Sequence, residues 1–235
     1  MFSGIAHRLR NLDKLQHGMH GILFKEILGH KEIKKIINNA ILCKNPVHVL
    51  LVGRPGSAKT MFLLEVYRII KGSLFVVGSN TTKAGLLDQL FEMKPKFLLI
   101  DEIEKMNKQD QISLLNLMET GIISEIKMNK TREMLLKCRV FACANSCEKI
   151  PEPLLSRFLV LEIPEYSYVQ FKEIVAFRLK KEDVREDISI GIAEKVWHEL
   201  RSKDIRDAVK IGRLSTSFED TSFIVNMMKK KNKNQ

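Results

Sequence analysis

The residues best suited to chemistry form a short glycine-containing loop, Gly53-Arg54-Pro55-Gly56-Ser57-Ala58-Lys59-Thr60, which is followed by Met61. It lies between a predicted buried strand and a predicted helix, which is the setting that a phosphate-binding loop requires. Glycines let backbone N–H groups turn toward a polyphosphate, and the start of the helix adds positive potential. We therefore expect residues 53–61 to bind a nucleoside triphosphate, with the ammonium of Lys59 on its β- and γ-phosphates.

One position in this loop departs from the usual pattern G-x-x-x-x-G-K-[ST]. Ala58 stands where that pattern has its second glycine. A methyl group is small, so we expect the loop to keep its shape provided that the backbone at Ala58 does not need a positive φ. The alternative interpretation of the segment is a structural turn between a strand and a helix.

Two carboxylates end a second buried strand. Asp101 and Glu102 directly follow the apolar run Phe97–Ile100. We expect this strand to lie beside the strand that leads into the loop, which would bring both acids close to the bound phosphates. Asp101 and the Thr60 hydroxyl would then hold Mg²⁺, and Glu102 would orient and activate the attacking water. Two solvated acids at the start of the next helix are the alternative.

The elements around these residues alternate between strand and helix. Short β-branched runs predict strands, and apolar residues at helical spacing predict helices. The predicted strands are 47–52, 74–77, 97–100, 140–144 and 159–163, and the predicted helices are 26–43, 61–71, 84–93 and 109–120. This order predicts βαβ units, and therefore an α/β fold with a mainly parallel sheet and helices on both faces.

After Pro164 only helical periodicity continues, in segments near 168–180, 190–202 and 204–215. The sequence therefore predicts four parts along the chain. They are a basic lead-in over residues 1–21, a nucleotide-binding α/β domain over 22–164, a small all-α domain over 165–228, and a disordered lysine-rich tail over 229–235.

Four segments in this order resemble the Walker A, Walker B, sensor-1 and arginine-finger elements of AAA+ ATPases. They are Gly53–Thr60, Leu98–Glu102, Ala144–Asn145 and Leu155–Phe158. The resemblance implies a P-loop NTPase core of three αβα layers followed by an all-α lid. It also implies that Asn145 positions the attacking water, that Arg157 reaches the γ-phosphate held by a neighbouring subunit, and that Arg206 is the sensor-2 arginine of the lid.

Each of these polar residues has a simpler interpretation. Asn145 could cap a turn. Arg157 could form a surface ion pair, and Arg206 could form a salt bridge on the lid with Asp204 or Asp207.

Further segments refine the resemblance. Residues 24–30 are similar to the segment that packs on adenine in this superfamily, which makes Ile27 and Leu28 candidate nucleotide contacts. The alanine at position 58 resembles the variant loop of minichromosome maintenance helicases. Residues 83–86, followed by 97–105, look most like RuvB, the bacterial Holliday-junction branch-migration motor, or like MoxR-type ATPases.

The charge balance favours a polyanionic partner. The 235 residues include 39 Lys and Arg against 28 Asp and Glu, a net charge of +11, and such a surface attracts nucleic acid or nucleotides. The alternating segment Ile122–Met134 carries Lys127, Lys130 and Arg132 near its predicted turn. It predicts a hairpin that either tracks DNA phosphates or is a solvated surface feature.

The leading expectation is an AAA+ ATPase that uses ATP and Mg²⁺ to remodel a macromolecule, with DNA as the first partner, in the manner of a RuvB-like helicase or branch-migration motor. The family resemblance of Arg157 implies a homo-oligomeric ring, most simply a hexamer. The alternatives are a MoxR-like chaperone that acts on a protein and a nucleotide-switched ring or clamp-loading subunit. No run approaches the roughly 18 apolar residues of a membrane helix, so no membrane association and a cytoplasmic location are expected.

Overall fold

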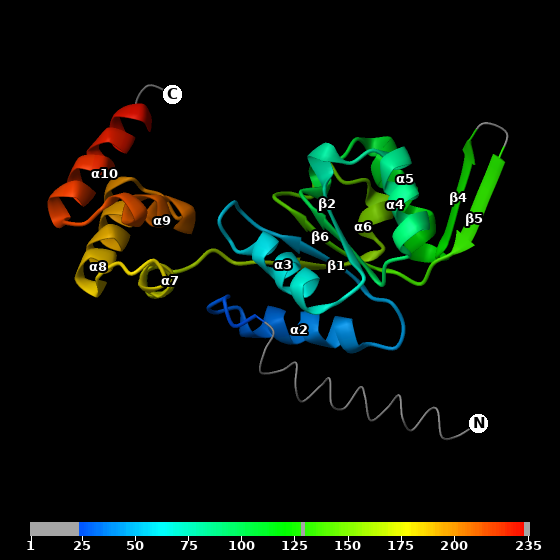
Figure 1. Cartoon of the computed structure of the whole chain (residues 1–235), viewed down its shortest axis with the longest axis horizontal. Helices are drawn as coiled ribbons and strands as arrows, with labels where there is room; N and C mark the ends of the chain where they lie inside the picture. Colours follow the sequence, from blue (N-terminus) through cyan, green and yellow to red (C-terminus); the bar gives the residue numbers. More distant parts are fainter. Residues whose placement is uncertain (1–23, 128–129, 233–235) are drawn as a thin grey trace, which may run out of the picture. The chain divides into compact units, whose positions relative to one another are not determined.

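The computed structural model describes residues 24–127 and 130–232 (Figure 1). The predicted lead-in over residues 1–21 lies outside the described part. By its internal contacts the chain divides into two compact units. The first holds the residues up to Gly53 together with Ala58–Ile163, and the second holds Arg54–Ser57 together with the residues from Pro164 onward.

Among the described residues, five parallel strands form the middle layer of the first unit. Their order across the sheet is β2 (Ser73–Val77), β3 (Phe97–Asp101), β6 (Arg139–Ala144), β1 (His48–Val52) and β7 (Phe158–Glu162). Every neighbouring pair is parallel, which confirms the predicted α/β fold. One expectation is wrong: β3 is not beside β1, because β6 lies between them.

Successive side chains of the central strands enter two different hydrophobic clusters. Leu98 and Val140 pack with α4 (Lys83–Met93) and α5 (Lys108–Glu119), whereas Leu99 and Phe141 pack with α2 (Lys31–Leu42) and α3 (Lys59–Ile69). Figure 1 shows the two helix pairs on either side of the sheet. A strand that is covered on both faces needs apolar residues in an unbroken run, and this is the pattern that made these strands predictable. The result is a three-layer αβα unit.

A separate antiparallel hairpin follows α5. It pairs β4 (Ile122–Lys127) with β5 (Lys130–Leu135), in a register that places Glu125 opposite Arg132. Gly121 introduces it with a φ of 75°, and a Cβ at that position would lie 2.9 Å from the carbonyl oxygen of Leu136. Glycine is therefore needed where the chain enters the hairpin. The hairpin expected for residues 122–134 is present.

Four α-helices dominate the described part of the second unit: α7 (Tyr168–Lys180), α8 (Glu186–Glu194), α9 (Ile205–Leu214) and α10 (Phe218–Asn232). A capping box between Ser167 and Gln170 starts α7. The lysine-rich residues 229–232 belong to α10, so the prediction that disorder begins at residue 229 is wrong. Val225 anchors α10 in the core of the unit, and the lysines that follow are good helix formers. Lys229 also pairs with Glu199, with 2.5 Å between Nζ and Oε2.

Within the part of the chain that the structure describes, no helix has both the length and the apolar character to span a membrane.

Candidate nucleotide-binding site

Three predicted site segments follow the carboxyl ends of strands in one sheet. Gly53 follows β1, Asp101 ends β3 and Asn145 follows β6. Because these strands are parallel, their carboxyl ends share one edge of the sheet. The N–H of Gly53 donates to the carbonyl of Ala144, at 3.2 Å, which joins the start of the loop to the end of β6. We call this side of the sheet the carboxyl edge.

The loop between β1 and α3 contains two residues with left-handed backbone conformation. Gly56 has a φ of 83° and Ala58 a φ of 66°. The condition set in the sequence analysis, that Ala58 needs no positive φ, is therefore not met. A residue with a Cβ accepts this conformation at a cost of about 1–2 kcal/mol. Ala58 is also the N-cap residue of α3, so the chain reverses its backbone twist immediately before the helix begins.

Lys59 and Thr60, the first residues of α3, lie close to the loop and the acids. Lys59 is buried, and its Nζ donates to the carbonyl of Gly53 at 2.5 Å. The hydroxyl of Thr60 donates to Oδ2 of Asp101 at 2.9 Å. This contact crosses β6, because α3 packs over both β3 and β6. The structure thus joins the end of the predicted phosphate-binding loop to the first carboxylate, while Met61 is half-buried and packs against the core.

The oxygen atoms of Thr60 and Asp101 suit a divalent cation. Burial raises the pKa of Asp101, the hydrogen bond from Thr60 opposes that shift, and the charge of the neighbouring Glu102 adds to it. Mg²⁺ prefers oxygen ligands and usually binds to only a few protein groups. A carboxylate in contact with a hydroxyl supplies two suitable oxygen ligands. A bound cation would favour the ionised form of Asp101. The residues present therefore fit the predicted magnesium site.

Glu102 is held in an unusual backbone conformation just beyond β3. Its φ is 55°, and its carboxylate pairs with Lys105, with 2.8 Å between Oε1 and Nζ. A Cβ on Gly78 would lie 2.2 Å from the carbonyl oxygen of Glu102. A glycine after β2 is therefore required for the close approach that supports this loop.

Asn145 is bonded to an acid that the sequence analysis did not single out. Both its backbone N–H and its side-chain Nδ2 donate to Oε1 of Glu104, at 3.0 and 2.8 Å. Glu104 lies in the short 3₁₀ helix η2 (Ile103–Lys105) and is 9% exposed. The run Asp101-Glu102-Ile103-Glu104 displays a third acid, but sequence alone does not reveal that this one turns inward.

The two predicted adenine contacts differ in exposure. Ile27 is 2% exposed and packs in the cluster that contains Phe24 and Phe62. Leu28 is half-buried. Ile27 therefore contributes to the core, and Leu28 is the member of the pair whose side chain is accessible.

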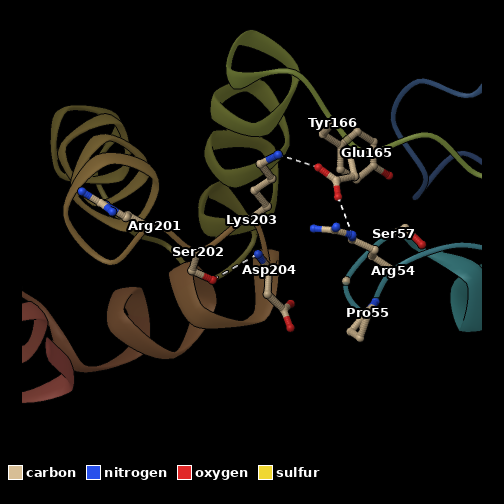
Figure 2. Close-up of a pocket in the computed structure, with 10 residues that line it drawn as sticks. Arg54, Pro55, Ser57, Glu165, Tyr166, Arg201, Ser202, Lys203 and Asp204 are labelled. Atoms are coloured by element: carbon tan, nitrogen blue, oxygen red, sulfur yellow. Dashed lines mark hydrogen bonds and ion pairs between the residues drawn. The ribbon is translucent and has the colours of Figure 1, made fainter. Parts of the chain in front are cut away.

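The tip of the loop belongs to the second unit, where it lines a cavity of about 340 Å³ (Figure 2). The cavity is lined by Arg54, Pro55, Gly56, Ser57, Glu165, Tyr166, Arg201, Ser202, Lys203 and Asp204. Glu165 pairs with Arg54 at 2.9 Å and with Lys203 at 2.5 Å. The hydrogen bond from Lys203 and the nearby charge of Arg54 lower the pKa of Glu165. The cavity therefore has both basic and acidic walls.

Arg206 is bonded within its own helical turn. Its Nε donates to both carboxylate oxygens of Asp204, at 3.0 and 2.9 Å, and Nη2 donates to Oδ2 at 2.7 Å. Asp204 also caps α9 by accepting the N–H of Arg206. The hydrogen bond to Asp204 raises the pKa of Arg206. The lid salt bridge that was the simpler interpretation is present, and a phosphate contact of Arg206 stays a prediction.

Arg157 lies at the opposite end of the strands. It immediately precedes β7, and Phe158, the first residue of β7, pairs with His48, the first residue of β1. The predicted phosphate-binding loop follows the last residue of β1, about 13 Å away at 3.3 Å per residue. Arg157 donates to Glu119 at 3.0 Å and to the carbonyl of Pro153 at 3.2 Å. We call this side of the sheet the amino edge.

Comparison with known families identifies the region that contains the loop and the carboxylates. Residues 49–165 match the model of the ATPase family associated with various cellular activities (AAA). The chain contains an AAA domain. The matched region runs from β1 to the end of β7 and includes the whole carboxyl edge.

Known proteins similar in sequence to this AAA chain include DNA replication licensing factors. It is 28% identical over 178 residues to mcm2 of Schizosaccharomyces pombe, a match that covers 58% of this chain and 21% of that protein. It is 27% identical over 209 residues to mcm2 of Xenopus laevis, covering 76% of this chain and 24% of that protein. The chain therefore spans about a quarter or less of the length of these relatives.

Among solved structures, the AAA chain is similar in fold to RuvB of Thermotoga maritima, described as a Holliday junction branch migration motor. The TM-score is 0.63 at 21% identity, over 82% of this chain and 63% of that one. A mutant form of the same protein gives a TM-score of 0.65 at 22% identity, with 82% and 64% covered. At this identity the likeness establishes the fold alone.

Proposed function

We propose that the AAA domain binds and hydrolyses ATP with Mg²⁺, and that it uses the energy to remodel DNA. The observation that carries the proposal is the 2.9 Å hydrogen bond between Thr60 and Asp101. It shows that the start of α3, just after the loop, contacts the carboxylate of Asp101, so that a single ligand could touch both.

Each residue of the carboxyl edge has a distinct task in this proposal. The backbone N–H groups of the loop would surround the β- and γ-phosphates, and Lys59 would leave the carbonyl of Gly53 to neutralise their charge. Thr60 and Asp101 would hold Mg²⁺, which supplies positive charge to the phosphate oxygens when bound. Glu102 would orient the attacking water, and Asn145 would accept a hydrogen bond from that water.

The position of Arg157 supports an assembly of several subunits. Arg157 lies about one strand length from its own phosphate-binding loop, so it cannot stabilise the γ-phosphate bound there. A neighbouring copy that places its amino edge against this carboxyl edge would bring its Arg157 to the nucleotide. A ring satisfies this requirement for every subunit, and a hexamer is the size that the family resemblance implies.

DNA is favoured by charge and by the relatives. The net charge of +11 attracts a polyanion, and the sequence relatives are named as DNA replication licensing factors. The hairpin supports DNA binding less than the sequence suggested, because Arg132 is paired with both Glu125 and Asp88. The side chains of Lys127 and Lys130 lie outside the described ones. A cytoplasmic location stays a prediction of the sequence.

The test is an ATPase assay on the purified chain without DNA and with single-stranded, duplex or branched DNA, each at low and high salt. We expect Mg²⁺-dependent turnover that DNA stimulates, with a stimulation that weakens steeply as salt rises, because phosphate contacts release counterions. The largest stimulation by branched DNA would support a RuvB-like motor.

The remaining outcomes contradict the DNA proposal in different ways. Turnover that only a protein partner stimulates would indicate a MoxR-like chaperone. Tight ATP binding with negligible turnover under every condition would indicate a nucleotide-switched subunit of a ring or clamp loader. Absence of ATP binding would contradict the nucleotide-binding site itself.

A further inference from the structure

Glu104 occupies an unexpected place for an acid. It is 9% exposed, and its Oε1 accepts two hydrogen bonds from one residue, the backbone N–H and the side-chain Nδ2 of Asn145. Its other oxygen, Oε2, is buried and has no hydrogen-bond partner among the described residues. A buried polar atom without a partner costs stability. Stability alone therefore does not explain why an acid stands here.

The local backbone explains how Glu104 reaches Asn145. Glu102, with its left-handed φ of 55°, turns the chain away from the line of β3. The next residues form η2, which packs against β6. In consequence, Asp101 faces Thr60, Glu102 faces Lys105, and Glu104 turns inward to the end of β6.

The two hydrogen bonds determine which atoms Asn145 offers to a ligand. A carboxamide that rotates freely can present either its oxygen or its nitrogen. With Nδ2 on the carboxylate of Glu104, the oxygen Oδ1 must point the other way, as an acceptor. An acceptor is what a water molecule needs if one of its hydrogens is to be held while its lone pair faces the phosphate.

We infer that Glu104 is a positioning residue, which fixes the carboxamide of Asn145 so that Oδ1 receives the attacking water. The inference rests on the proposed ATP hydrolysis and adds a residue to it. Glu104 does not touch the nucleotide in this scheme, and it acts only through Asn145.

A double-mutant cycle tests this dependence. Glu104→Ala should lower kcat about tenfold and leave KM within about twofold, because binding of ATP does not use the carboxamide. Asn145→Ala should lower kcat by about tenfold or more. In the Asn145→Ala background, Glu104→Ala should change kcat by less than about twofold, because its only route of action is already gone.

Two further variants separate positioning from folding. Glu104→Gln keeps an acceptor oxygen for both N–H groups and should restore kcat to within about threefold of the wild type. Gln111→Ala is the matched control, since Gln111 is buried beneath the same loop and donates to the carbonyls of Met106 and Lys149, without a hydrogen bond to Asn145. It should lower thermal stability as much as Glu104→Ala and leave kcat close to that of the wild type.

The contact has its own spectroscopic readout. The side-chain amide resonance of Asn145, assigned by its loss in Asn145→Ala, should be protected from hydrogen exchange in the wild type and exposed in Glu104→Ala. Equal losses of kcat from Glu104→Ala in both backgrounds, or an unprotected amide in the wild type, would overturn the inference. Failure of the proposed function would differ, because the wild type itself would not hydrolyse ATP.

Discussion

The two edges of the same parallel sheet use some of their polar side chains for different purposes. At the carboxyl edge, side chains bond to side chains across the sheet: Thr60 to Asp101, and Asn145 to Glu104. At the amino edge, His48 bonds to backbone groups, namely the carbonyl of Met118 and the N–H of Val140, both at 3.0 Å. The carboxyl edge thus holds together the groups of the proposed nucleotide site, while His48 at the amino edge joins α5 to the sheet.

Arg157 is the residue of the amino edge to which we assign a catalytic role. Arg157 contacts Glu119, the last residue of α5, and His48 bonds to the residue before it. The group that would complete the site of a neighbour therefore contacts the same helix, α5, to which His48 is bonded. In the proposed assembly, one sheet therefore serves two nucleotides, its own and that of the next subunit.

Loss of Lys59 at the carboxyl edge should reduce activity more than any other change considered. Lys59→Ala should abolish nucleotide binding and turnover, because no other side chain in the loop supplies an ammonium to the β- and γ-phosphates. Binding of a fluorescent ATP analogue measures this. Lys71→Ala, an exposed lysine beyond the end of α3, is the control and should bind normally. Tight binding by Lys59→Ala would show that the loop is a structural turn.

Glu102→Gln should separate binding from chemistry at the same edge. An amide cannot accept a proton from water, so turnover should fall by about 10³ while ATP stays bound. Single-turnover measurements with radiolabelled ATP detect the trapped nucleotide. The exposed Glu92 of α4 offers the control variant Glu92→Gln. Normal product release from Glu102→Gln would remove Glu102 from its role with the water.

Arg157→Ala should cause the same loss of turnover as Glu102→Gln, although Arg157 lies at the amino edge. ATP binding should be retained and hydrolysis should fall by about 10³, the effect of removing an arginine finger supplied by another subunit. A mixture of Lys59→Ala and Arg157→Ala chains should regain part of the activity, because some interfaces then pair an intact loop with an intact arginine. No recovery in mixed assemblies, or unchanged turnover by a monomeric Arg157→Ala sample, would contradict the assignment in trans.

His48 should make the stability of the amino edge depend on pH. Burial lowers the pKa of His48, and its Nδ1 accepts a hydrogen bond, so the folded chain holds it neutral. The unfolded chain takes up a proton below about pH 6.5. Stability should therefore fall as the pH drops below that value.

Urea unfolding at about pH 7.5 and about pH 5.5 measures this effect. His48→Ala should lose about 3 kcal/mol at the higher pH, because two buried backbone groups lose their partners. When the pH is lowered, the free energy of unfolding of His48→Ala should fall by less than that of the wild type. The pKa of His30 is lowered as well, but it contributes equally to both chains. If acidification lowered the free energy of unfolding equally in the wild type and in His48→Ala, His48 would not be the group that makes stability depend on pH.

The smallest expected effect concerns the strained loop residue. Ala58→Gly should raise the free energy of unfolding by about 0.5 kcal/mol, since glycine tolerates a positive φ but gains more entropy when unfolded. Ala84→Gly, at an exposed position within α4, should lower it by about 1 kcal/mol. Thermal or urea unfolding distinguishes the two signs. Destabilisation by Ala58→Gly would indicate that the packing of the methyl group outweighs the strain.

Much of the fold was predictable because its elements are local in origin. The buried strands are unbroken apolar runs, and the helices repeat apolar residues at 3.6-residue spacing, so both patterns can be recognised without knowing the tertiary structure. The helix over 218–232 was not predicted as an element, because the expected helical segments end near residue 215 and residues 218–228 were assigned only to the all-α domain. Three of its last four residues are lysines, and this end of α10 is supported by the burial of Val225 and the pairing of Lys229 with Glu199.

For the candidate site, local patterns in the sequence were enough to find the residue types and to place them after the ends of strands: a glycine-containing loop before a helix, and two acids after an apolar run. Which of these residues meet depends on the tertiary fold. It placed β6 between β1 and β3 and yet joined Thr60 to Asp101 through α3, bonded Asn145 to Glu104, and put Ala58 in a left-handed conformation. Strand order and side-chain burial arise from contacts between residues distant in sequence, which no local pattern encodes.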